Sequence, residues 1–243
     1  MEFEDTAFVL AARVHGETGA IVEVLTAEHG KWAAHVAGGA SRRLKPALQT
    51  GAPVAFSYRA RTADQLGSAR IEALGEGPAA LFDDPLALAG LAASAAVVAA
   101  ALPEREPHPG LYLAFESLMG ALADVAIWPP VLVRFEAGLL GELGFGLDLS
   151  RCAVSGQSDD LAFVSPRTGR AVSAAAGEPY RERLLALPPF LLSAQHSLSA
   201  GDVGAGLALT GHFLETCVFA PLGRPLPAAR DRLLERLADQ GRL

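Results

Sequence analysis

Residues 29–51 read HGKWAAHVAGGASRRLKPALQTG, and this stretch decides how the N-terminal part of the chain is interpreted. Gly30 can adopt the positive φ that a short turn between strands needs. Alternating apolar residues follow from Trp32 to Val36, which is typical of a strand with one apolar face. A Gly-Gly pair then breaks the strand, and SRRLK at 41–45 places three cations within four residues. The pattern predicts a β-hairpin followed by a basic loop.

Positive charge is concentrated around this loop. Residues 31–70 hold seven Lys and Arg side chains and one acid, Asp64, which gives a net charge of +6 in a chain of formal charge −7. An isolated basic run is ordinarily a solvated loop, but in an acidic chain this concentration favours contact with a polyanion. We expect phosphate contacts from six residues: Lys31, Arg42, Arg43, Lys45, Arg59 and Arg61. Trp32 and Tyr58 are candidates to stack on bases.

The composition is that of a folded protein. The chain has 243 residues, of which 51% are hydrophobic and 19% charged, enough for one large domain or two modest ones. Its two cysteines, Cys152 and Cys217, exclude a disulfide framework and fit a reducing compartment. The N-terminal residues MEFEDTAF lack the basic and apolar regions of a signal peptide. We expect a cytoplasmic protein.

Residues 86–102, LALAGLAASAAVVAAAL, carry no charge and approach the lower length limit of a membrane span. Alanine dominates the stretch, and few of its side chains are the large apolar ones that favour insertion. Asp84 and Pro85 are typical of a helix start, and Pro103 is typical of a helix end. We therefore expect a buried, alanine-rich helix and no membrane partner.

Short strands are expected over most of the first 78 residues, separated by turns at regular intervals. They are predicted at 7–13, 21–26, around Trp32, at 54–59 and at 68–74. Five such strands in a short segment favour a small β-barrel, with the OB-fold as the leading candidate. Residues 1–78 are therefore expected to be a nucleic-acid-binding domain.

Residues 79–243 are expected to form a helical domain. Apolar residues recur at helical spacing, as in the stripe of Leu111, Phe115, Leu118 and Leu122. The predicted helices cover 85–102, 110–125, 130–143, 180–186, 202–219 and 227–239. Residues 147–177 are too polar for a helix, and we expect an inserted β-hairpin with one strand at 161–165.

No catalytic motif is found in the sequence. The spacing Gly206-x4-Gly211 is followed by His212 where a phosphate-binding loop needs lysine. HExxH, GxSxG and paired CxxC motifs are absent, and the six histidines show no i, i+4 pair. The sequence therefore predicts a protein that is not an enzyme.

Several segments together resemble the RecO family of bacterial recombination mediators. They are GETGAIVEVLTAEHGK at 16–31, LPEREP at 102–107, FEAGLLGELGFGLDLSRCAVSG at 135–156, FVSPRTGRAVS at 163–173 and LTGHFLE at 209–215. The resemblance implies an α+β, multidomain chain: an N-terminal OB-fold β-barrel, then an all-helical domain with a small inserted zinc-knuckle-like element. It also implies recombinational repair: binding single- and double-stranded DNA, annealing strands and helping to load the recombinase.

The same resemblance implies partners: RecR, the C-terminal tail of single-stranded-DNA-binding protein, RecF as a further candidate, and association with the nucleoid. That tail is acidic with an apolar tip, so its receptor should combine an apolar groove with cations. The segment VLVRFE at 131–136 resembles the family helix that serves this purpose. The candidate residues are Arg134, Phe135, Leu139, Arg224 and Arg230. The alternative is that Arg134 pairs with a surface acid.

The inserted element departs from the family pattern. Many members hold zinc there with two CxxC pairs, whereas this chain has Cys152-Ala-Val-Ser155 and Ser173-Ala-Ala-Ala176. One thiol cannot hold a structural tetrahedral zinc ion, so we expect no metal and no cofactor. Two other function classes stay open: an OB-fold protein that binds RNA or the ribosome, and a protein-interaction scaffold without annealing activity.

Overall fold

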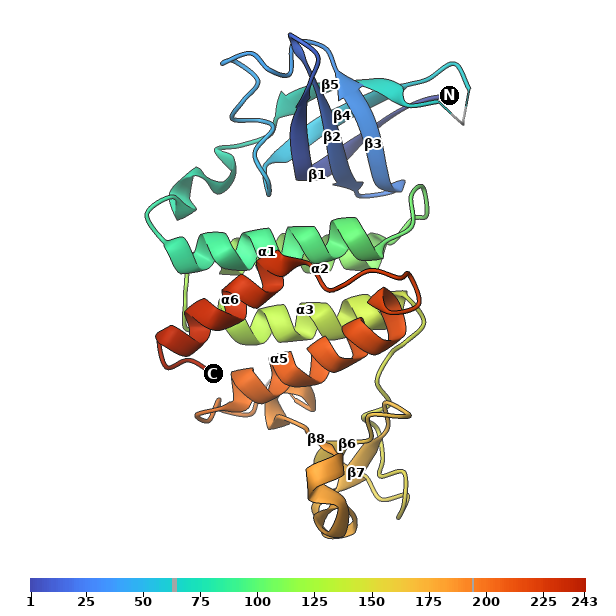
Figure 1. The fold of residues 1–243 in the computed structure, drawn as a ribbon, viewed down its shortest axis with the longest axis vertical. Coiled ribbons are helices and arrows are strands. Elements are labelled where there is room, and N and C mark those ends of the chain that lie inside the picture. The colour runs from blue at the N-terminus through green and yellow to red at the C-terminus, as the bar shows by residue number, and fades with distance from the viewer. Residues whose placement is uncertain (63–64, 194) are drawn as a thin grey trace. The chain divides into compact units, whose positions relative to one another are not determined.

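The structure is a computed structural model that describes residues 1–62, 65–193 and 195–243. It confirms an α+β chain in which an N-terminal five-stranded barrel is followed by a helical region (Figure 1). Backbone contacts divide the chain into two compact units. The first comprises Met1–Ala123 with Pro227–Arg230, and the second comprises Asp124–Leu226 with Asp231–Leu243.

The barrel closes in the order β1-β2-β3-β5-β4. Neighbouring strands are antiparallel except β3 and β5, which are parallel. The first strand is longer than predicted because its first half pairs with β4 and its second half pairs with β2. The bounds are β1 Glu2–His15, β2 Gly19–Thr26, β3 Gly30–Val36, β4 Pro53–Arg59 and β5 Gly67–Ala73.

Alternating apolar side chains of the strands fill the barrel. Successive side chains of a strand point to opposite faces, so every second residue of β3 and β4 points inward. The inward residues include Trp32, Ala34, Val54, Phe56 and Tyr58, all at most 2% exposed. The predicted alternation is therefore confirmed, and its apolar face is the barrel interior.

The alanine-rich helix of the first unit is buried, as expected. It is α1, Pro85–Ala101, preceded by a 3₁₀ turn η1 (Gly77–Leu81) and followed by α2, Pro109–Ala121. The Asp84 carboxylate caps α1 by accepting hydrogen bonds from the backbone N–H groups of Leu86 and Ala87. Within the described ranges, no helix has both the length and the apolar character needed to cross a membrane.

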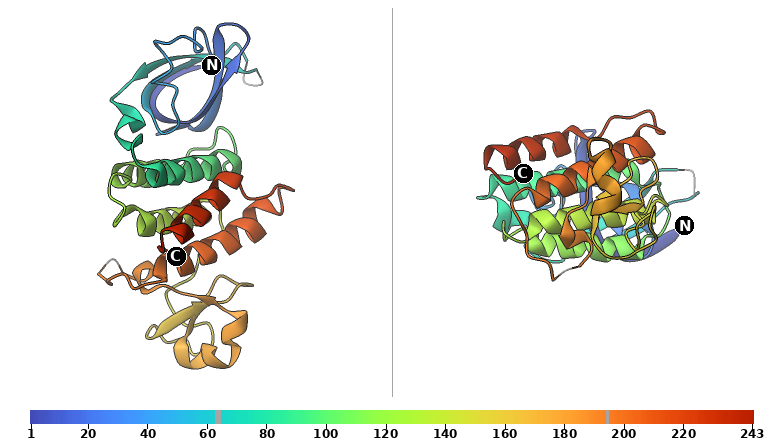
Figure 2. Two further views of the ribbon diagram at one scale, coloured as in Figure 1. Left: turned by 60° about the vertical axis from the view of Figure 1, so that its left-hand side comes forward. Right: turned by 90° about the horizontal axis from the view of Figure 1, so that it is seen from below.

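Helices α3 and α5 pack against each other in the second unit, and the insert lies between them in sequence (Figure 2). The expected hairpin is confirmed as β6 and β7, and β8 pairs with the other edge of β6. The expected helix at 180–186 is wrong: a 3₁₀ turn at 178–183 runs into β8, because β6 offers that segment an edge to pair with. The bounds are α3 Trp128–Glu142, β6 Leu161–Val164, β7 Ala171–Ser173, α4 Ala174–Gly177, η2 Glu178–Arg183, β8 Leu185–Ala186, η3 Pro189–Leu191, α5 Asp202–Phe213, a π-helical segment η4 Leu214–Phe219 and α6 Ala228–Asp239.

The connection between α1 and α2 pairs with the start of β3. The Lys31 ammonium donates a hydrogen bond of 2.7 Å to the carbonyl of Ala99 in the last turn of α1. The Arg105 N–H donates to the Lys31 carbonyl at 2.8 Å. Gly30 has φ 75°, and a Cβ placed there would lie 1.8 Å from the Glu106 carbonyl oxygen. Only glycine therefore fits where the loop crosses the hairpin.

This position contradicts the prediction that Lys31 contacts phosphate. The residue is 9% exposed, and its ammonium is used at the carboxyl end of a helix, where a cation also interacts favourably with the helix dipole. Lys31 therefore stabilises the first unit, and its ammonium is not available to contact DNA.

We expect Lys31→Met to lower the free energy of unfolding by about 2 kcal/mol, because a hydrogen bond from a charged group contributes about 1.5–3 kcal/mol. Urea denaturation followed by circular dichroism measures the change. Lys45→Met is the matched control: Lys45 is exposed, and its substitution should change stability by less than about 0.5 kcal/mol. Equal stability of the two variants would contradict the assignment.

Candidate nucleic-acid interface

The loop between β3 and β4, residues 37–52, presents three exposed cations: Arg42, Arg43 and Lys45. Its apolar side chains anchor it, since Ala47 and Leu48 belong to the barrel core and Leu44 packs against that core. Backbone hydrogen bonds from Lys45 to Ser41 and from Leu48 to Leu44, both 3.1 Å, order the turn between them. The loop therefore holds its cations on an ordered backbone.

Arg59, the last residue of β4, and Arg61 in the loop that follows form a second exposed group. Arg59 lies six positions along β4 from Pro53, where the basic loop rejoins the barrel, a strand length of about 20 Å. The Arg59 guanidinium lies 3.9 Å from the Glu2 carboxylate, with both side chains more than two-thirds exposed. Such a pair contributes little to stability. Asp64, the acid counted in the basic run, lies outside the described residues.

A further cation, Arg70 on β5, lies beside the basic loop. Arg43 and Arg70 line the same hollow on the barrel. The Arg70 guanidinium also lies 2.9 Å from the Glu72 carboxylate, and both side chains are largely exposed. Arg70 belongs to the basic run of the sequence but not to the predicted contacts, and strand spacing alone does not place it at the same hollow as Arg43.

Both stacking predictions are wrong. Trp32 is 2% exposed, its indole N–H donates to the His29 carbonyl at 2.7 Å, and the Arg105 guanidinium lies 4.9 Å from the ring centre. Tyr58 is 1% exposed, and its hydroxyl accepts a hydrogen bond from the Gly67 N–H at 3.1 Å. Barrel closure turns the apolar face of both strands inward, so neither ring offers a face to a base.

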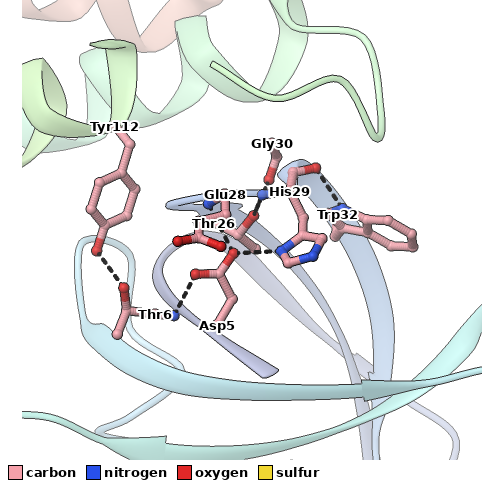
Figure 3. Close-up of polar contacts among 8 residues, drawn as sticks. All are labelled: Asp5, Thr6, Thr26, Glu28, His29, Gly30, Trp32 and Tyr112. Atoms are coloured by element: carbon pink, nitrogen blue, oxygen red, sulfur yellow. Dashed lines mark hydrogen bonds and ion pairs between the residues drawn. The ribbon is translucent and has the colours of Figure 1, made fainter. Parts of the chain in front are cut away.

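A polar network that the sequence analysis missed fixes the hairpin before Lys31 (Figure 3). The Asp5 carboxylate accepts the N–H of Thr6 at 2.7 Å and of Glu28 at 2.9 Å, and lies 2.8 Å from Nδ1 of His29. The Thr26 hydroxyl accepts the His29 N–H and donates to the Gly30 carbonyl. These bonds join β1 to the β2–β3 turn and hold the turn beside the α1–α2 connection.

Tyr112 joins α2 to the same network. Its hydroxyl donates to the Thr6 hydroxyl at 3.3 Å, and its ring packs against Phe8. Burial raises the pKa of Tyr112 above its ordinary value, so the phenol keeps its proton at neutral pH. No short-range signal in the sequence marks this pair, because 106 residues separate Thr6 from Tyr112.

The predicted partner groove is contradicted at three of its five residues. Phe135 is 3% exposed and Leu139 is fully buried, so their side chains belong to the core and cannot line an open groove. Arg230 is 3% exposed and cannot form a rim. Arg134 and Arg224 are exposed. Arg134 donates to the Phe190 carbonyl at 2.8 Å, and none of the ion pairs found between described residues involves it.

A hollow of about 260 Å³, with polar and apolar lining in similar measure, lies elsewhere in the second unit. The amino end of α3 provides Pro129 and Pro130, the segment before α5 provides Leu198, and the chain end provides Arg242 and Leu243. This hollow combines apolar walls with a cation, which is the chemistry predicted for the partner groove.

The insert is organised around the Cys152 sulfur. The sulfur accepts hydrogen bonds from the N–H groups of Val154 and Ser155, both 3.4 Å, and from the N–H and hydroxyl of Ser173 at 3.2 and 3.4 Å. Cys152 is 1% exposed. Across the described residues, no group of three or more His, Cys, Asp or Glu side chains is arranged to hold a metal. The sulfur therefore joins the two segments that resemble zinc-ligand pairs.

Burial raises the pKa of the Cys152 thiol, but the hydrogen bonds from Ser155 and Ser173 outweigh burial and lower the pKa from 9.0 to about 6. Because the pKa is lower in the folded state than in the unfolded state, the thiolate stabilises the fold at pH values above the ordinary thiol pKa. That contribution is lost as the pH falls through about 6.

We expect thiolate ultraviolet absorbance of the folded protein to appear with a midpoint near pH 6, because these donors favour the ionised sulfur. Cys152→Ser should remove this transition, whereas Cys217→Ser should retain it. The free energy of unfolding of the unsubstituted chain should fall as the pH is lowered from about 9.0 to about 6. A midpoint near the ordinary thiol pKa would contradict the interpretation.

Comparison with known proteins gives two family matches. The model for the N terminal of recombination protein O matches residues 1–74, and the model for its C terminal matches residues 83–225. A DNA repair protein RecO from Phenylobacterium zucineum is 73% identical over 243 residues, all of both chains. One from Caulobacter sp. strain K31 is 67% identical with the same coverage. One from Rhodospirillum centenum is 51% identical over 97% of this chain and 94% of its own. The chain therefore belongs to the recombination protein O family, RecO.

Proposed function

We propose that this chain is a non-enzymatic recombination mediator. It binds single- and double-stranded DNA, anneals complementary strands and, with RecR, helps to load recombinase onto DNA coated by single-stranded-DNA-binding protein. RecF is a further partner, and the protein acts at the nucleoid. Full-length relatives are named DNA repair proteins, which supports a role in DNA repair.

The observation that carries the proposal is the ordered loop of exposed cations on the barrel. Residues 37–52 contain three Lys and Arg side chains and no acid, in a chain of formal charge −7. Cations attract phosphates whatever the base sequence. Neutralised strands repel each other less, and this favours pairing between complementary strands.

Because Trp32 and Tyr58 are buried, we expect DNA binding through phosphate contacts rather than through stacking on these two rings. OB-folds often add base stacking to phosphate contacts, and stacking depends little on salt. With these two rings in the core, electrostatic contact dominates the proposal. The affinity should therefore fall steeply as the salt concentration rises.

We expect replacement of Arg42, Arg43 and Lys45 together by alanine to weaken binding of all single-stranded sequences alike. The slope of log affinity against log salt should flatten by about 2, because each neutralised phosphate contributes about 0.7. Fluorescence anisotropy of labelled oligonucleotides at several salt concentrations measures it. The matched control replaces Arg151, Arg167 and Arg183, three exposed arginines of the second unit, and should leave the slope unchanged. Equal slopes for both triple variants would place the interface elsewhere.

Annealing separates the mediator from the two other function classes. A mediator should pair complementary oligonucleotides coated with single-stranded-DNA-binding protein, and the triple loop variant should pair them more slowly. An interaction scaffold would recruit the coating protein without pairing the strands. An RNA-binding protein would prefer RNA oligonucleotides of the same sequence.

The acidic tail of single-stranded-DNA-binding protein is proposed to bind the second unit. Arg134 and Arg224 supply exposed charge, and the hollow beside Arg242 supplies apolar walls. The bond from Arg134 to the Phe190 carbonyl leaves other guanidinium N–H groups to meet a carboxylate, since arginine carries five donors.

We expect Arg134→Ala to weaken binding of a synthetic tail peptide about tenfold to hundredfold, because a charge-assisted contact contributes about 1.5–3 kcal/mol. Binding of naked DNA should stay nearly the same. Arg242→Ala, measured in parallel by calorimetry, tests the hollow as the rival position. Peptide loss in Arg242→Ala alone would move the groove there, and equal loss of peptide and DNA binding would contradict a separate tail site.

A further inference from the structure

One edge of the barrel is only partly paired. Strand β5 pairs with β4 from Ser68 to Ala73, but with β3 only at Gly67 and Ser68. Strand β3 ends at Val36, whose carbonyl accepts the N–H of Gly39 as the chain turns away. Among the described residues, no strand pairs with β5 on this side along residues 69–73.

The alternation of hydrogen-bonded residues along β5 shows which of its backbone groups point away from β4. The Leu74 N–H donates to the Pro53 carbonyl at 3.0 Å. In an antiparallel pair, every second residue bonds to the partner strand. Ser68, Arg70 and Glu72 therefore direct their N–H and C=O groups at β4. Ala69, Ile71 and Ala73 direct theirs away from β4.

A hollow of about 490 Å³ lies beside this edge. Its walls come from the end of β3, from the basic loop and from residues 69–73 of β5. Leu44 and Ala47 of the loop pack down onto the barrel core. Ala69 and Ala73 have small side chains; Ala73 is exposed, Ala69 is half-buried and Ile71 between them is buried.

The chemistry of the edge selects a peptide. Donors and acceptors alternate along an unpaired strand, and an extended peptide backbone matches both. Phosphate oxygens only accept hydrogen bonds, so a nucleic-acid backbone would leave the carbonyl groups of the edge unmatched. Natural proteins often protect open edges with charges or proline. Here Arg70 and Glu72 carry charge, whereas Ala69, Ile71 and Ala73, whose backbone groups face the hollow, are neither charged nor proline.

The surrounding charge selects an acidic peptide. Arg43 and Arg70 line the hollow, and Arg42 and Lys45 lie on the same loop. Glu72 is the acid that lines it, paired with Arg70. We propose that the open edge of β5 docks an extended acidic peptide of a partner protein, which adds to the barrel as a sixth strand. Residues 69–73 span about 16 Å, enough for about five peptide residues. This inference goes beyond the proposed DNA binding.

The test uses the full chain and a labelled, end-capped peptide of four Val-Glu repeats. Ala73→Pro removes an N–H that faces the hollow, keeps the bond from Leu74 to Pro53, and places proline where an edge strand tolerates it. Ala73→Ser keeps the N–H and is the matched control. We expect binding of the peptide to weaken at least about tenfold in Ala73→Pro and to stay unchanged in Ala73→Ser. DNA affinity should be the same in both variants.

Two measurements on the unsubstituted chain keep the test decisive if Ala73→Pro folds poorly. A peptide methylated on alternate backbone nitrogens should not bind, and hydrogen exchange of the Ile71 amide should slow when the unmethylated peptide is added. Equal binding of both peptides, or an unchanged exchange rate, would overturn the proposal. An oligothymidylate that slows Ile71 exchange when the peptide does not would assign the hollow to single-stranded DNA instead.

Discussion

The buried ammonium group of Lys31 links the barrel to α1, the helix that follows it. Removing a cation from water is costly unless the charge is hydrogen-bonded, and the Lys31 ammonium meets this condition at the carbonyl of Ala99. The end of α1 must therefore lie beside the start of β3. Around that contact the α1–α2 connection pairs with β3, and the Arg105 guanidinium covers Trp32.

This arrangement decides which parts of the barrel are open to partners. OB-folds commonly bind oligonucleotides on the face of their second and third strands and on adjoining loops. Here the start of β3 is occupied by the chain's own connection between α1 and α2. The predicted phosphate contacts that are exposed lie on the β3–β4 loop, at the end of β4 and in the β4–β5 loop instead. The proposed DNA contacts and the proposed peptide edge both follow from this division of the barrel surface.

Local sequence patterns predict the strands and helices well. They do not predict contacts between residues that are far apart in the sequence. Alternation places the strands, and the Asp84-Pro85 start with Pro103 bounds α1. Trp32 lies on the apolar face that this alternation marks, and its burial follows the alternation rather than the stacking prediction. Lys31 and Ala99 are 68 residues apart, and no local pattern reveals their bond. Phe135 and Leu139 follow a helical stripe typical of a core, and they are buried as such a stripe predicts.

The close crossing at Gly30 also limits how this chain can vary in length. Connections on a protein surface ordinarily accept inserted residues. Residues 103–107 are different, because Arg105 bonds to Lys31 and the Glu106 carbonyl lies against Gly30. One added residue would shift both contacts out of register. Insertions should therefore gather in other connections of the barrel, such as the β4–β5 loop, while this short crossing keeps its length.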